Sequence, residues 1–134
     1  MTYTARDWRL AIAAIYAAFL FAIMAWTGSP GDFQGWLFVF AVYGFGLLPI
    51  ALLCLIATHP LAHGIGAGLL AAFGIYAHVT TLFIAPPDAQ SALVFLFVPF
   101  YQLAAAAIWV VVVALVSFVV ARKATTRRET KGNR

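Results

Sequence analysis

The sequence predicts an all-α integral membrane protein with four transmembrane helices in an antiparallel bundle. Three observations predict this fold class. Of the 134 residues, 65% are hydrophobic and only 9% are charged, which is too little charge to cover a water-soluble domain. Four apolar stretches follow one another with short breaks, and a membrane span needs about 20 apolar residues. All eight Lys and Arg residues lie at the two ends of the chain, before residue 10 and after residue 121.

The first three apolar stretches each predict one span. They cover residues 10–26, 36–57 and 61–85, and they end at "TGSPGDFQG", "THP" and "PPD". These breaks are rich in Gly, Pro and Asp, which are turn formers. The spans should be helices, because backbone polar groups in lipid must find hydrogen-bond partners within the segment. Residues 1–121 therefore form a single transmembrane domain.

The fourth stretch, residues 92–121, is too long for an upright span. Thirty residues of helix measure about 45 Å, whereas the hydrocarbon core is about 30 Å thick. Pro99 removes a backbone hydrogen bond, so a kink or break is expected near it. Two arrangements remain open. Residues 91–100 form an interfacial segment, or the whole stretch is one long kinked helix that projects outward or packs on a partner.

The basic residues predict the orientation. With four spans both termini lie on the same side, and the side that carries Lys and Arg is the cytoplasmic one. The chain is therefore expected to have its N-terminus and C-terminus in the cytoplasm, and its alanine-rich composition suggests a bacterial inner membrane. The basic, polar tail of residues 122–134 has no apolar periodicity and is expected to be disordered.

Two histidines and the single cysteine lie near the predicted turn between the second and third spans. Cys54, His59 and His63 are the weak candidates for a metal site. Their spacing matches no zinc pattern, and no carboxylate lies nearby. His59 precedes Pro60, which is a favoured first residue of a helix. We therefore expect a tight cytoplasmic turn with solvated histidines, no metal and no cofactor.

A second set of polar residues is predicted within the outer half of the membrane. His78 lies deep in the third stretch, and an ionisable residue at such a depth is a functional candidate. Tyr43 and Gln102 are expected at a similar level on neighbouring helices. Together these three are weak candidates for binding haem or a quinone. The simpler interpretation is a helix-to-helix hydrogen bond.

A stripe of small residues on the third stretch predicts close helix packing. Small residues allow helix backbones to approach each other in lipid. Whether the partner helix belongs to the same chain or another one stays open. The stripe comprises Gly64, Gly68, Ala71, Ala72 and Gly74.

The sequence contains no catalytic motif, so a non-enzymatic function is predicted. The end-loaded basic residues indicate topology rather than nucleic-acid binding. The leading hypothesis is a membrane protein that acts through helix contacts with the bilayer, itself or another membrane protein, as an accessory, assembly or immunity-type subunit. The alternatives are a redox-linked subunit that binds haem or quinone near His78 and a small channel or carrier for a neutral or apolar solute.

Overall fold

The computed structural model describes residues 4–27, 31–85 and 93–132, and it describes side chains between Trp8 and Ala124. All regular secondary structure within these ranges is helical. The helices are α1 (Thr4–Thr27), α2 (Phe33–Leu55), α3 (Pro60–Val79), its π-helical continuation η1 (Thr80–Ile84) and α4 (Val94–Gly132). Four apolar segments are long enough to cross a membrane, over Trp8–Thr27, Phe33–Leu55, Pro60–Ile84 and Val94–Ala124.

The helix starts follow local capping rules. Asp32 precedes α2, and its Oδ1 accepts a hydrogen bond of 2.8 Å from the backbone N–H of Gly35. This cap satisfies one of the free donors of the first turn, so α2 begins three residues before the predicted residue 36. Pro60 opens α3 as expected, and His59 before it is left-handed, with φ 47°. Histidine is one of the few residues besides glycine that populate this region.

The C-terminal end of α3 is a π turn that the sequence did not indicate. The backbone N–H of Ala85 donates to the Thr80 carbonyl at 2.8 Å, which is a separation of five residues. Single π turns within α-helices recur at functional sites. This turn begins two residues after His78, which the sequence had marked as a functional candidate.

The fourth apolar stretch is one continuous helix of 39 residues. It passes through Pro99 without a break, so an interfacial segment separate from the helix is not observed after Val94. Residues 91 and 92 lie outside the described ranges. The Pro99 ring is fully buried and packs towards Gly46 of α2, where an added Cβ would lie at an ordinary contact distance of 3.9 Å from the proline Cγ. Such packing makes an intramembrane proline tolerable.

The helix continues to Gly132, across the tail in which the composition predicted disorder. Adding residues to an existing helix is far easier than starting one. Arg, Lys, Ala and Glu, which make up much of residues 121–131, are good helix formers. The apolar part of α4 therefore provides the nucleus for its basic end.

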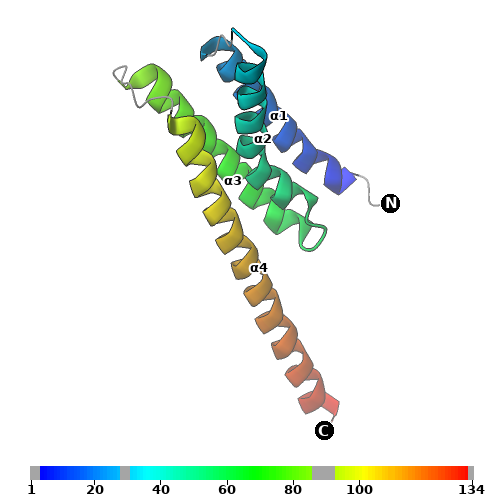
Figure 1. The fold of residues 1–134 in the computed structure, drawn as a ribbon. Helices are drawn as coiled ribbons and strands as arrows, with labels where there is room; N and C mark the ends of the chain where they lie inside the picture. Colours follow the sequence, from blue (N-terminus) through cyan, green and yellow to red (C-terminus); the bar gives the residue numbers. More distant parts are fainter. Residues whose placement is uncertain (1–3, 28–30, 86–92, 133–134) are drawn as a thin grey trace.

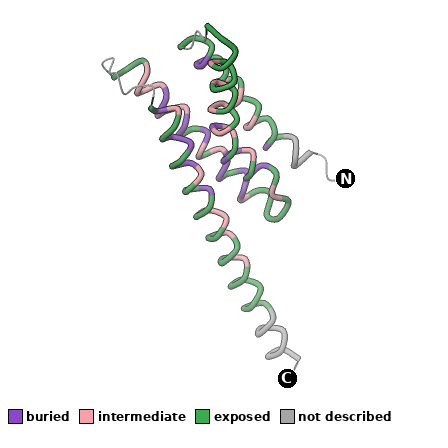
Figure 2. Tube along the Cα trace, in the orientation of Figure 1, coloured by how far each residue is buried: buried purple, intermediate pink, exposed green. Residues whose placement is uncertain are grey.

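The interior lies where α2 and α3 each pack against both α1 and α4. Figure 2 shows the buried residues gathered there, while the C-terminal part of α4 is exposed as far as its burial is described. In Figure 1, α4 continues well past the turn that joins α2 to α3. The central core consists of Tyr16, Leu20, Ile50, Leu53, Cys54, Ala67, Ala71 and Ala106.

Glycines let α3 approach its neighbours closely. A Cβ on Gly64 would overlap the Trp8 ring of α1, and one on Gly66 would lie only 2.6 Å from Nε1 of Trp109 in α4. The Trp109 indole also donates to the Ala62 carbonyl at 3.1 Å. Small residues therefore serve two different helix contacts within this chain.

Of the predicted stripe, Gly64, Ala71 and Gly74 are buried, Gly68 is half-buried, and Ala72 is exposed. A Cβ on Gly68 would have only an ordinary 3.7 Å contact with Ile12. Gly66 was not part of the predicted stripe. In the structure it faces Trp109 of α4, whereas Gly64 faces Trp8 of α1.

Candidate functional site

A polar network joins three helices in the interior. The Gln102 side-chain amide of α4 donates to the Tyr16 hydroxyl of α1 at 3.1 Å and to the Leu70 carbonyl of α3 at 2.8 Å. The Tyr16 hydroxyl in turn donates to Gln102 Oε1 at 3.3 Å. Tyr16 and Gln102 are fully buried. Because both side chains are shielded from solvent, these hydrogen bonds fix the relative register of α1, α3 and α4.

His78 lies on the same helix as Leu70, and Gly74 connects it to this network. The Nδ1 of His78 lies 2.7 Å from the Gly74 carbonyl, and a Cβ on Gly74 would overlap both Gln102 and Tyr16. A carbonyl only accepts, so Nδ1 carries the proton and Nε2 is left as an acceptor. Nε2 is buried and has no partner among the described residues. A buried polar atom without a partner calls for an explanation.

The rings around His78 are aromatic. Phe19 of α1 lies edge-on at a centroid distance of 6.3 Å, and Phe95 of α4 lies at 5.1 Å. His78 is therefore buried against apolar rings, and its Nε2 faces no hydrogen-bond partner among the described residues.

The predicted cluster of Tyr43, His78 and Gln102 is assembled only in part. Gln102 and His78 both lie against Gly74, but the Tyr43 hydroxyl donates to the Ala17 carbonyl at 3.3 Å. Tyr16 occupies the position that was predicted for Tyr43. The sequence could have indicated this role, since Tyr16 lies in the middle of the first apolar stretch, away from the membrane interface where tyrosine is usually found.

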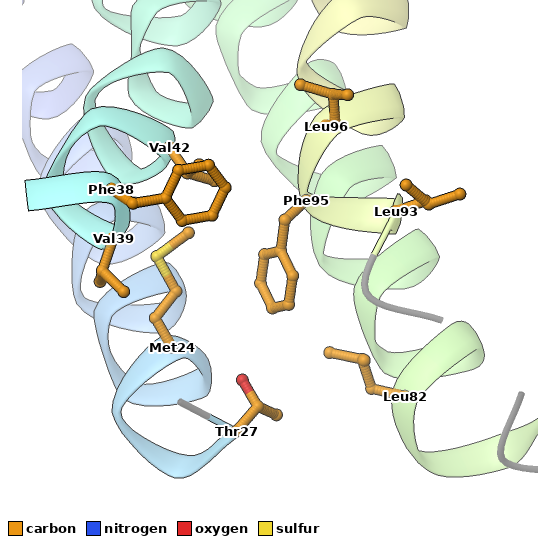
Figure 3. Close-up of a pocket in the computed structure, with 9 residues that line it drawn as sticks. All are labelled: Met24, Thr27, Phe38, Val39, Val42, Leu82, Leu93, Phe95 and Leu96. Atoms are coloured by element: carbon orange, nitrogen blue, oxygen red, sulfur yellow. The ribbon is translucent and has the colours of Figure 1, made fainter. Parts of the chain in front are cut away.

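A crevice of about 490 Å³ opens next to Phe95, at the end of the helices opposite the α2–α3 turn. Figure 3 shows the Phe95 ring projecting into the middle of this space, between α1 and η1. Its walls are almost entirely apolar, and Thr27 supplies the one hydroxyl among them. The lining residues are Met24, Thr27, Phe38, Val39, Val42, Leu82, Leu93, Phe95 and Leu96.

The opposite end of the helices holds a buried arginine. Arg9 lies within the apolar segment Trp8–Thr27 and is only 4% exposed. Its Nη1 donates to the Ile56 carbonyl at 2.8 Å. Ile56 follows the last turn of α2, where carbonyls lack helical partners and favour a cation. Arg9 thus caps α2, and its Nε has no described partner.

The three candidate metal ligands do not converge. The Cys54 thiol donates to the Arg9 carbonyl at 3.2 Å, so it faces α1. His59 and His63 instead line a pocket of about 280 Å³ between the turn and α4. Among the described residues, no group of three or more His, Cys, Asp or Glu side chains is placed to hold a metal ion.

His63 differs from the expected solvated turn residue. It is only 2% exposed, and its Nδ1 has no partner among the described residues. The reason is packing. The neighbouring Gly64 has no side chain, so α1 lies directly against the first turn of α3 and covers it.

Comparisons with known proteins add no relative, since no protein-family description, curated protein or solved structure matches this chain.

Proposed function

We propose that this protein is a non-catalytic subunit of the bacterial inner membrane that acts through helix contacts, with α4 as the element that binds another membrane protein. One observation supports the proposal above the others. Only 6% of the most apolar window of α4 is buried within the chain, against 22%, 28% and 22% for the other three spans. The tight glycine contacts of α3 are made within the chain. The buried residues of α4 lie between Val94 and Ala106, and the helix is left largely exposed from Val111 to Ala124.

The length of α4 makes lipid alone a poor cover for this surface. Its apolar segment Val94–Ala124 has 31 residues, or about 46 Å at 1.5 Å per residue. The hydrocarbon core is about 30 Å thick. The Trp109 indole already reaches the first turn of α3, and the apolar face continues beyond it through Val112, Val116 and Val120, all about half exposed. A partner helix would cover that face, as in an accessory, assembly or immunity-type protein.

Co-isolation in a lipid-preserving polymer tests the proposal. We expect wild-type protein to co-isolate with one other membrane protein in a fixed ratio. Val112→Trp and Val116→Trp should lower that ratio at least tenfold, since a bulky ring disrupts helix contact but is tolerated in lipid. Leu69→Trp on the exposed face of α3 is the matched control. An equal loss in the control, or no partner at all, would contradict the proposal.

The bundle is proposed to be antiparallel, with both termini in the cytoplasm. In a chain whose Cys54 is replaced by alanine, cysteines introduced singly at positions 30 and 88 should react with an impermeant reagent added to intact cells. Cysteines at positions 3 and 130 should react only after the membrane is permeabilised. The expectation follows from the eight basic residues at the chain ends, and external labelling at position 130 would reverse it.

A second candidate function, quinone or quinol binding, is favoured by the free Nε2 of His78. A quinol hydroxyl would donate a hydrogen bond to Nε2, which has no described partner. The crevice beside Phe95 would hold the apolar tail of the quinol. A short-tailed quinol should bind wild-type protein, and its binding should fall at least tenfold in His78→Phe but not in Tyr43→Phe. Equal binding by both variants would eliminate this candidate.

A further inference from the structure

The pocket between the α2–α3 turn and α4 is lined by hydrogen-bonding side chains but by no carboxylate. Four of its eight lining residues carry a polar side chain. The Ser117 hydroxyl already donates to the Val113 carbonyl of its own helix at 2.7 Å. Thr58, His59 and His63 are therefore the side chains left to donate to a ligand. At about 280 Å³, it holds several water volumes of about 30 Å³ each. The polar lining residues are Thr58, His59, His63 and Ser117, and the apolar ones are Ile56, Val110, Val113 and Ala114.

Positive potential is concentrated behind these donors. His63 lies within electrostatic reach of both Arg9 and His59. Arg9 is buried, holds the carbonyl of the lining residue Ile56, and contacts no carboxylate among the described side chains. The first turn of α3 also begins here, and a helix N-terminus carries a partial positive charge. A buried cation without a counter-charge is unfavourable, so an anion in the pocket would compensate it.

The polar groups are also left incomplete in a way that points to a ligand. The His63 side chain lines the pocket and is only 2% exposed, yet its Nδ1 has no hydrogen-bond partner among the described residues. The Arg9 Nε is likewise unpartnered within that part of the chain. The left-handed backbone of His59 (φ 47°) positions the turn, and non-glycine residues keep such a conformation only where the surrounding structure enforces it.

We propose that this pocket binds a phosphate group. His59, His63, Thr58 and the start of α3 would face its oxyanions, with Arg9 behind them. Two sources share this chemistry, namely the headgroup of an anionic phospholipid and free inorganic phosphate. The site does not depend on the α4 contact proposed above.

The test measures binding to the full-length protein in neutral detergent by native mass spectrometry and thermal shift. Its probes are phosphatidylglycerol, phosphatidylcholine and inorganic phosphate. Ser117→Glu places a carboxylate at the pocket, and Val116→Glu places it one residue away on the exposed face of the same helix. His63→Phe removes the buried imidazole at a similar volume, and its folding is checked by its retained helicity.

We expect wild-type protein and Val116→Glu to bind phosphatidylglycerol at least tenfold more tightly than Ser117→Glu, because like charges repel at contact distance. His63→Phe should bind as weakly as Ser117→Glu. Stabilisation by phosphatidylglycerol alone identifies a lipid headgroup, and stabilisation by inorganic phosphate alone identifies a soluble ligand. Equal binding by Ser117→Glu and Val116→Glu, or no preference over phosphatidylcholine together with no response to phosphate, would overturn the proposal.

Discussion

Replacing Gly74 by alanine is expected to lower the free energy of unfolding by about 1–3 kcal/mol, the usual effect of overpacking a filled interior. The added Cβ would overlap the Gln102 amide and the Tyr16 hydroxyl. Both groups belong to the network that joins α1, α3 and α4, so neither can move without breaking a buried hydrogen bond. Unfolding in mixed micelles, followed by helical circular dichroism, measures the change.

Two matched glycines provide the control. A Cβ on Gly68 would meet only Ile12 at 3.7 Å, and a Cβ on Gly44 would meet nothing within 4 Å. Alanine at these positions should leave stability unchanged or raise it, since alanine favours a helix over glycine by up to about 1 kcal/mol. If Gly74→Ala is as stable as Gly68→Ala, the buried network does not hold the three helices in register.

Replacing Arg9 by alanine is expected to lower the free energy of unfolding by about 1.5–3 kcal/mol, the typical contribution of a hydrogen bond to a charged group. The variant leaves the Ile56 carbonyl without its 2.8 Å donor at the end of α2. It also removes a buried side chain against which Gly64 packs. The same unfolding measurement applies.

Lys123→Ala is the control for Arg9→Ala, because Lys123 is also basic but is exposed near the far end of α4. Its effect should stay within about 0.5 kcal/mol, as is usual for surface changes. Equal effects of the two substitutions would mean that Arg9 acts only as one more basic residue near the chain ends.

The positions of the four spans were predictable because lipid imposes a simple length and polarity rule on the sequence. The helix ends depended on finer chemistry. Asp32 lies in a Gly- and Pro-rich stretch that indicated a loop, yet its side chain caps α2. The break considered at Pro99 is absent: α4 continues through the proline, whose ring is buried in the interior.

The candidate sites were harder to predict than the spans. Position along a helix gives the depth of a residue, but the direction in which it points depends on the unknown rotation of its helix against the neighbours. Hence Gln102 and His78 both lie against Gly74, while Tyr16 rather than Tyr43 completes the network. His63 was expected in water because polar residues usually remain solvated. His63 is buried between the turn and α4, and Arg9 is buried beside it, where Gly64 brings α1 onto α3.

The central claim is that the exposed face of α4 contacts another membrane protein. Photocrosslinking in living cells tests it most directly, with a photoreactive side chain introduced singly at Val112 and Val116 of α4 or, for comparison, at Leu69 and Phe73 of α3. All four positions are about half exposed. The proposed function predicts one discrete protein adduct at positions 112 and 116 and none at positions 69 and 73. Adducts with lipid alone at all four positions would contradict it.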